Sequence, residues 1–293
     1  MLAQNYFLNR DKNPIELISQ ILDKLNEILI HQVDELHTQN EKIDYWQHPL
    51  EALSFKLSSH IASLRNLLSQ SSMPYRGTRL SIMDISSINI IIRAIIENYL
   101  TLYHFHFEPI QSNQREFRFL IYVVSALKNR QAFSTSTPEN KAQKERDIIE
   151  IEKFQEQLKV NSYFIQLPVK EQKRYLSTKE AKELNWITLL DNSDLKPEIF
   201  KDIWRLQSNY AHSEFLSVLQ IRQHPKDLNE SAHLMALLAS MILATTINNL
   251  GKLFISSKNI IETFDTDNKS LFSYFLELGT KGECIIFPHP KNI

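Results

Sequence analysis

Residues 86–105 read SSINIIIRAIIENYLTLYHF, and on a helix the apolar side chains of this stretch point in nearly every direction. When the helix is wound at about 100° per residue, five of its polar side chains fall on one narrow stripe. That stripe consists of Ser86, Asn89, Arg93, Glu97 and His104. A helix that is apolar on most sides is enclosed by its neighbours. The sequence therefore predicts a buried helix from residue 84 to about residue 107, packed inside a helical bundle.

A second apolar stretch, residues 234–250, reads LMALLASMILATTINNL and contains no charged side chain. It is barely long enough to cross a membrane, and hydroxyl and amide side chains interrupt it. We interpret it as part of a central bundle helix from about residue 229 to residue 256. No membrane contact is expected.

Helix start signals recur along the rest of the chain. Asn13-Pro14-Ile15-Glu16 combines a cap residue, a proline in the first turn and a glutamate that can return to the cap. The fold class is therefore all-α, a multi-helix bundle of about eight to eleven helices. Further helices are expected at residues 49–70, 113–133, 197–209, 215–222 and 270–278, a loop at residues 71–81, and one extended segment in residues 284–293.

Residues 134–190 carry dense charge of both signs, and Thr137-Pro138 marks a helix start there. We interpret this segment as a charged, solvated helical insert within a single domain that spans residues 1–293. Just before it, Arg115 and Arg118 lie among aromatic residues. This pattern favours a core face with a basic, exposed opposite side.

The composition excludes several classes of function. The formal net charge is -1, so there is no global field to attract an anionic membrane, and RNA would have to be held by a local patch. The four glycines are too far apart to form a phosphate-binding loop. Cys284 is the only cysteine, which excludes intramolecular disulfides and thiolate zinc sites. Together with a start that lacks an apolar leader, this favours a reduced, cytoplasmic location.

Arg93 and Glu97 need partners in an otherwise apolar helix, because an isolated buried charge is costly. The two residues are four apart and can pair with each other. Two interpretations stay open: the pair is a structural salt bridge in a polar seam between helices, or it forms the wall of a polar cleft.

A second polar group lies in WRLQSNYAHS, residues 204–213. If the helix continues to His212, then Arg205, Ser208 and His212 share one side, because seven residues make nearly two turns. An imidazole that exchanges protons near neutral pH and a guanidinium that binds phosphate together suit phosphodiester cleavage. The alternative is a solvated polar face with Ser213 capping the next helix. The opposite, core-facing side would consist of Ile199, Ile203, Leu206 and Tyr210.

The Arg205-to-His212 element, on a helix of an all-α bundle, resembles the signature of the HEPN superfamily, in which four to six residues separate an arginine from a histidine. The resemblance implies a metal-independent endoribonuclease, or a module derived from one, in a bacterial toxin or antiphage defence system. It implies Arg205 and His212 as catalytic residues, RNA as substrate, no cofactor, and a homodimer that brings two motifs to one cleft. RAIIENY and SNYAHSEF also look like an uncharacterised bacterial family with an Arg-x-x-x-Glu helix and a later Tyr-x-His-Ser.

The two polar groups are expected to converge on one cleft, because buried polar groups in an apolar bundle are best satisfied together. His104 and His106 point away from each other on a helix, so no metal site is expected. Two further classes stay open: a non-enzymatic interaction protein with a structural polar seam, and a small-ligand sensor that uses the Arg93–Glu97 cleft. The expected supporting or substrate-binding residues are Arg93, Glu97, Ser208, Tyr210 and His104.

Overall fold

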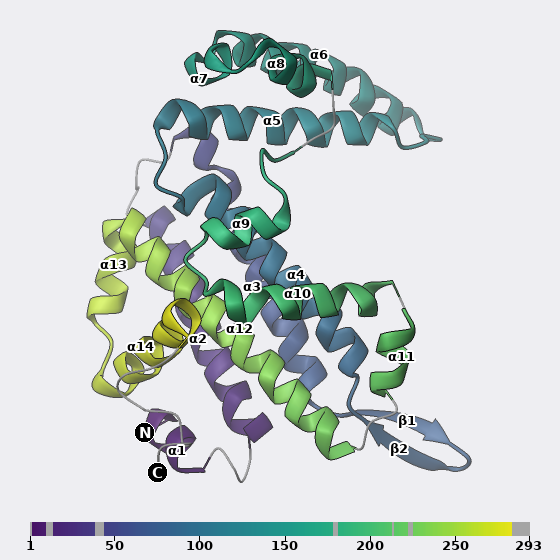
Figure 1. The fold of residues 1–293 in the computed structure, drawn as a ribbon, viewed down its shortest axis with the longest axis vertical. Helices are drawn as coiled ribbons and strands as arrows, with labels where there is room; N and C mark the ends of the chain where they lie inside the picture. The colour runs from purple at the N-terminus through teal and green to yellow at the C-terminus, as the bar shows by residue number, and fades with distance from the viewer. Residues whose placement is uncertain are drawn as a thin grey trace. The chain divides into compact units, whose positions relative to one another are not determined.

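The structure is a computed structural model, and it describes residues 2–9, 14–38, 44–177, 181–212, 214–221 and 225–282. Most of these residues lie in fourteen α-helices, with one 3₁₀ turn, one π-helical turn and one two-stranded hairpin (Figure 1). The all-α class is confirmed. The helices outnumber the expected eight to eleven because pieces such as α7 (Ser162–Gln166) are too short to show a helical period.

The other elements have the following bounds: α1 (Leu2–Asn9), α2 (Pro14–Thr38), η1 (Tyr45–Gln47), α3 (Pro49–Leu68), β1 (Ser71–Tyr75), β2 (Thr78–Ile82), α4 (Ile85–Leu102), η2 (Tyr103–Phe107), α5 (Ser112–Gln131), α6 (Pro138–Val160), α8 (Val169–Ser177), α9 (Trp186–Asn192), α10 (Pro197–Ala211), α11 (Phe215–Ile221), α12 (Pro225–Leu253), α13 (Ile255–Glu262) and α14 (Thr266–Lys281).

The chain divides into two compact units. Unit 1 comprises Met1–Ile43, His48–Phe107 and Trp186–Ile293, and unit 2 comprises Asp44–Gln47 and Glu108–Asn185. The charged segment at residues 134–190 lies almost wholly in unit 2, which also takes in α5 and the short segment 44–47. Unit 2 is therefore built around α5 as well as the charged helices.

The central helix of unit 1 is α12, which packs against α2, α4, α13 and α14. The hydroxyls that interrupt its apolar stretch are buried, and each one bonds to the carbonyl four residues earlier on the same helix. The buried amide of Gln32, on α2, donates to the carbonyls of Ile247 and Ser257 at 3.1 Å each. These bonds let a helix with polar residues lie in an apolar core. The hydroxyl bonds run from Ser240 to Ala236, from Thr245 to Met241 and from Thr246 to Ile242.

Two helices in the described part of the chain are long and apolar enough to cross a membrane, Ile85–Phe107 and Leu228–Leu253. Most of each helix is buried inside the protein. Core helices of soluble proteins share this length and composition. Both helices are therefore compatible with a soluble protein.

Residues 71–81, expected to form a loop, form an antiparallel β-hairpin instead, so that expectation was wrong. β1 pairs with β2, with Tyr75 opposite Thr78. Between them Arg76 and Gly77 both have positive φ, 47° and 79°, as in the two-residue type I′ turn that favours hairpins. The pattern was hard to detect because arginine occupies a position where asparagine or aspartate is usual, and because Pro74 interrupts the first strand.

Two predicted helix starts are confirmed by their capping bonds. The Asp84 side chain accepts a hydrogen bond from the Ser87 N–H at 3.0 Å at the start of α4. The Thr137 hydroxyl accepts one from the Asn140 N–H at 3.3 Å at the start of α6. The expected cap at Asn13 and the expected extended segment at residues 284–293 lie outside the described residues.

Unit 2 has a small core of its own, formed where α7 and α8 pack against α5 and α6. Tyr175 packs edge-on against Phe117, with 5.1 Å between the ring centroids. On α6 only Asp147 and Leu158 are buried, which agrees with the expectation of a solvated, charged helix. The buried residues of this core are Phe117, Leu120, Ile121, Leu158, Phe164 and Tyr175.

The packing of α14 on α12 depends on a glycine. A β-carbon added at Gly279 would come within 2.9 Å of the Met241 β-carbon, an atom fixed by the α12 backbone. The two helices would have to move apart. We expect Gly279→Ala to lower the free energy of unfolding by about 1–3 kcal/mol, measured by denaturant titration.

Gly251→Ala is the matched control, since Gly251 is also helical. There the added β-carbon would meet the Cδ1 tip of Ile261 at 2.7 Å, and that side chain can rotate. Alanine also favours a helix by about 1 kcal/mol over glycine. If Gly279→Ala proved as stable as Gly251→Ala, the close approach of α12 and α14 would be refuted.

Candidate functional site

Arg93 and Glu97 lie one turn apart on α4 and form an ion pair, with 2.9 Å between Arg93 Nε and Glu97 Oε1. The indole N–H of Trp204, on α10, donates to the same glutamate oxygen at 3.2 Å. The guanidinium carbon of Arg93 lies 5.0 Å from the centroid of the Trp204 ring, within range of cation–π attraction. These three side chains of unit 1 form one group, which we call the Trp204 cluster.

The Trp204 cluster lies at the edge of the core. The side chains of Arg93 and Glu97 are 20% and 26% exposed. Within the described residues, Nη1 of Arg93 is buried and has no hydrogen-bond partner. Asn89, on the same stripe, is buried and donates to the Ile85 carbonyl at 2.8 Å, within its own helix. The stripe is therefore satisfied mostly by local bonds and by one residue of α10.

His104 does not share the accessible edge of this stripe. It is fully buried, in the π-helical turn Tyr103–Phe107 that follows α4. In a π-helix the hydrogen bonds span five residues, so side chains beyond Tyr103 leave the directions of a regular α-helix. The His104 ring packs against Phe105, with 5.0 Å between the ring centroids. Among the described residues, no group of three or more histidine, cysteine, aspartate or glutamate side chains could hold a metal ion.

Arg205 and His212 lie near the C-terminal end of α10. The helix ends at Ala211, and His212 is its C-cap residue, whose N–H bonds to the Ser208 carbonyl at 3.2 Å. The Arg205 side chain is 61% exposed and lies 3.3 Å from Asp202. His212 is also exposed, whereas Ser208 is half-buried. The guanidinium and the imidazole are thus both accessible to solvent.

The buried face of α10 differs from the expected one. Tyr210 is buried as predicted, but Phe200 and Gln207 fill the core with it. The centre of the buried face lies about 60° around the helix from the predicted one, toward the side that carries Trp204. The Trp204 indole on that side bonds to Glu97 of α4. The expected core residues Ile199, Ile203 and Leu206 are only partly buried.

The two polar groups meet at Trp204, the first residue of the 204–213 group. This contact is about two turns before Tyr210 and His212, where convergence was expected. The Trp204 cluster is therefore one of the contacts that hold α10 against α4, beside its buried residues Phe200, Gln207 and Tyr210.

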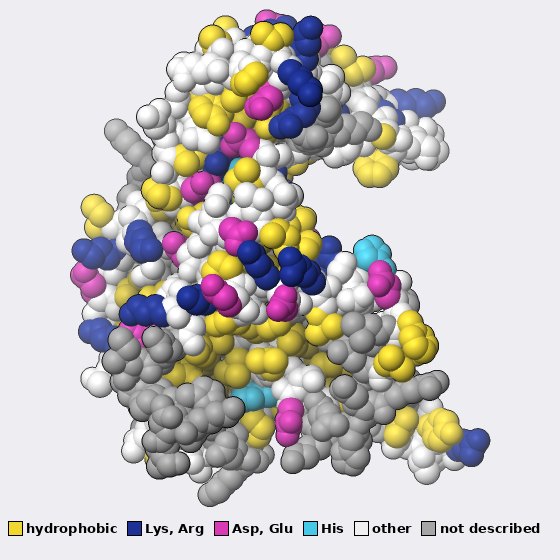
Figure 2. All heavy atoms as spheres, viewed as in Figure 1, with side chains coloured by type: hydrophobic (Ala, Val, Ile, Leu, Met, Phe, Trp, Pro, Cys, Tyr) yellow, Lys and Arg dark blue, Asp and Glu magenta, His cyan; other side chains and the backbone are white. Residues whose placement is uncertain are grey.

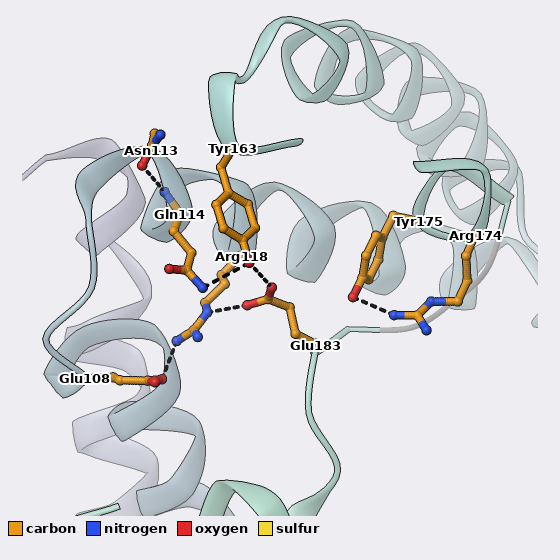
Figure 3. A network of polar contacts seen from close by, with 8 residues as sticks. All are labelled: Glu108, Asn113, Gln114, Arg118, Tyr163, Arg174, Tyr175 and Glu183. Carbon is orange, nitrogen blue, oxygen red and sulfur yellow. Dashed lines mark hydrogen bonds and ion pairs between the residues drawn. The ribbon is translucent and has the colours of Figure 1, made fainter. Parts of the chain in front are cut away.

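Unit 2 contains a buried ionic centre that the sequence pattern did not indicate (Figure 3). Arg118 is only 2% exposed, so its expected place on an exposed basic side was wrong. Its Nη1 lies 2.5 Å from Glu108 Oε2, and its Nε lies 2.6 Å from Glu183 Oε2. The two carboxylates are 10 and 65 residues away in the sequence. No local spacing could have revealed the second one.

Neighbouring groups orient the Arg118 centre. The Tyr163 hydroxyl donates to Glu183 Oε1 at 2.9 Å, and the Gln114 amide donates to the Tyr163 oxygen at 3.2 Å (Figure 3). Burial and the charge of Glu183 raise the pKa of Tyr163 well above its ordinary value, so this phenol stays protonated and remains a donor. The centre ties Glu183, in the segment that follows α8, to α5. These contacts indicate that the Arg118 centre stabilises the fold of unit 2.

No family model matches this chain, and no match was found among curated proteins or among solved structures.

The Trp204 cluster makes a prediction about stability. Glu97→Ala leaves the Arg93 charge and the Trp204 N–H without their acceptor. We expect the free energy of unfolding to fall by about 1–3 kcal/mol, less than for a fully buried pair because both side chains are partly exposed. Glu97→Gln is the control, since it keeps an oxygen that can accept from Trp204. Stability should fall in the order wild type, Glu97→Gln, Glu97→Ala, and equal stabilities would contradict the bonding described.

The Arg118 centre makes a second stability prediction. Arg118→Met leaves two partly buried carboxylates with no cation between them, and we expect a loss of about 3–5 kcal/mol. Hydrogen exchange of the α5 and α6 amides should report it. Without Arg118 the carboxylates of Glu108 and Glu183 repel each other, and adding Glu183→Gln removes one of these two negative charges. The double variant should therefore lose less stability than the sum of the losses of the two single variants. Additive losses would show that the two residues do not interact.

Proposed function

We propose that this chain is a metal-independent endoribonuclease of the HEPN type, or a module derived from one, with Arg205 and His212 as its catalytic residues. The observation that supports the proposal most directly is that both side chains are exposed near the C-terminal end of one helix. Groups that act on a phosphodiester must reach it from the surface, and no other pair in residues 204–213 combines a phosphate-binding cation with a proton acceptor.

The chemistry uses the chain's own side chains. Neutral His212 takes the proton of a ribose 2′-hydroxyl, and the 2′-oxygen then attacks the adjacent phosphorus. The guanidinium of Arg205 stabilises the charge that develops on the phosphoryl oxygens. The 5′-oxygen leaves and takes a proton from water or from the imidazolium of a second motif, so the products are a 2′,3′-cyclic phosphate and a 5′-hydroxyl end.

A rigid helix favours such a site, because catalytic groups must be held in place by their supports. Phe200, Gln207 and Tyr210 anchor α10 in the core. On another side Trp204 bonds to Glu97. In this proposal Arg93, Glu97 and Tyr210 support the site by holding α10, and Ser208, between the two catalytic residues, would contact substrate.

We also propose that the active form is a homodimer. One imidazole can take the 2′-hydroxyl proton or protonate the leaving oxygen, and two positioned groups serve both steps better. A two-fold interface brings the same patch together from both copies. The helix after the motif, α11, offers a surface for it: Phe215 is 73% exposed, and Val218 and Leu219, on the same face, are exposed too.

RNA would be held by a local group of cations. On the face in Figure 2, acidic and basic side chains are interspersed over α10. With a formal net charge of -1, attraction depends on the few arginines and lysines near the motif. We include in the proposal a cytoplasmic location and a role in a bacterial toxin or antiphage defence system.

One observation favours a second candidate, a non-enzymatic interaction protein. Glu97 Oε1 accepts from both Arg93 and Trp204, so the polar stripe is bonded inside the protein as a structural seam would be. In that case the exposed side chains of α10 and α11 would contact another protein.

Cleavage of a structured RNA in the presence of a chelator tests the proposal. We expect the wild type to cleave, and His212→Ala and Arg205→Ala each to lose at least about a hundredfold in rate. The rate should also fall as salt is added. Product ends analysed by mass should carry a cyclic phosphate.

His31→Ala and Arg65→Ala are matched controls, because both residues are solvent-accessible on other helices and each pairs with a carboxylate. They should cleave like the wild type. Equal cleavage by all variants, or none by the folded wild type, would overturn the nuclease proposal and leave the interaction protein as the better one.

A further inference from the structure

A cavity of about 350 Å³, lined mostly by residues with polar side chains, lies in unit 1, next to α12 and α14 and beside the loop that leads into α10. Among the described residues that line it, Leu276 alone is apolar. Sites for small molecules begin at about this volume. Its other lining residues are Asp194, Asn248, Lys252, Ser273, Glu277, Thr280 and Lys281.

The walls of the cavity are held by fixed contacts. α12 and α14 touch at Met241 and Gly279, where no β-carbon separates them. The loop that carries Asp194 is pinned to α14 by a bond from the Lys196 N–H to the Gly279 carbonyl, 2.8 Å long. Leu195, next to Asp194, is buried. The cavity therefore has a defined shape without a ligand.

A buried amide positions one cation and one anion at the cavity. Asn249 is only slightly exposed; its Nδ2 donates to Asp194 Oδ2 at 2.8 Å, and its Oδ1 accepts from Lys252 Nζ at 3.0 Å. Lys252 and Asp194 are held 3.8 Å apart, longer than a hydrogen bond. Asn249 thus bonds to both charged groups and places them side by side.

The side chain of Tyr99, which is fully buried, contacts the same Asn249 amide from the core side. Its hydroxyl oxygen lies 3.4 Å from Asn249 Nδ2, the same nitrogen that bonds to Asp194. Burial, and then the charge of Asp194, raise the pKa of Tyr99 well above its ordinary value, so the phenol stays neutral. The amide is held on both sides, which fixes its orientation.

A second charge pair comes from α14. Lys281 Nζ and Glu277 Oε1 are 2.9 Å apart on the same helix. The cavity thus presents two ammonium groups and two carboxylates, with no net charge, and hydroxyls from Ser273 and Thr280. A simple anion or a simple cation would meet as much repulsion as attraction there. A ligand that carries both charges close together would meet a partner for each.

We propose that this cavity binds a small zwitterion of the free α-amino-acid class. The ligand ammonium would lie against Asp194 and Glu277, and its carboxylate against Lys252 and Lys281, since charge-assisted hydrogen bonds are the strong ones. The hydroxyls and the Asn248 amide would contact the ligand side chain. This site is separate from Arg205 and His212 and does not depend on the nuclease proposal.

Titration calorimetry of the full chain with each of the twenty free amino acids at millimolar concentration tests the proposal. We expect at least one to bind, and to raise the melting temperature. Acetate and methylammonium, which carry one charge each, should not bind at the same concentrations. No binding by any amino acid, or equal binding by the two single ions, would overturn the proposal.

Variants then locate the site. Asp194→Asn and Lys252→Met each remove one charge from a partly exposed side chain, and each should weaken binding by about tenfold or more. Lys258→Met and Glu262→Gln, an exposed ion pair on α13, are the matched controls and should bind like the wild type. Wild-type affinity in both Asp194→Asn and Lys252→Met would refute this cavity as the site. The melting temperature without ligand shows that each variant is folded.

Discussion

The burial of α12 against α2, α4 and α14 is the constraint on which the rest of unit 1 depends. A helix buried on several sides carries its polar groups into a medium without water, and each unpaired group there costs free energy. The hydroxyls of α12 meet this demand within the helix itself, and Gln32 reaches across from α2 to two backbone carbonyls. Gly279 allows α14 to pack closely against Met241 of α12, because a residue with a β-carbon at this position would collide with the Met241 side chain.

The same demand shapes α10. Glu97 lies at the edge of the core on α4, a mostly apolar helix, and its carboxylate accepts a hydrogen bond from the indole N–H of Trp204. The bond lies on the side toward which the buried face of α10 is displaced from the face that its apolar side chains predict. Arg205 and His212 are accessible on the same helix. The helix that carries the two proposed catalytic residues is thus held in part by the pairing of a partly buried carboxylate on another helix.

Polar groups in the interior are handled differently in the two units. In unit 1 they are mostly neutral, and backbone carbonyls or amides satisfy them. In unit 2 a nearly buried guanidinium lies between two carboxylates, with a tyrosine and a glutamine completing the network. Such a centre is specific in geometry, because a guanidinium binds planar carboxylates in fixed directions. It joins residues distant in sequence, which suits a unit with a small apolar core.

The sequence by itself determined the all-α class, the existence of the two buried helices α4 and α12, and the helix starts at Asp84 and Thr137, although α12 begins at Pro225 and ends at Leu253 and not at the expected residues 229 and 256. These features rest on periodicity and capping, which act within one or two turns of the chain. It also determined that Arg93 and Glu97 pair, because four residues make one turn. Only the tertiary structure decided that Trp204 completes this pair, that Arg118 is enclosed by Glu108 and Glu183, and that Asn249 holds Asp194 beside Lys252. Each of these arrangements includes a contact between residues far apart in sequence, Glu97 with Trp204, Arg118 with Glu183 and Asp194 with Asn249, so only the folding of the chain brings them together.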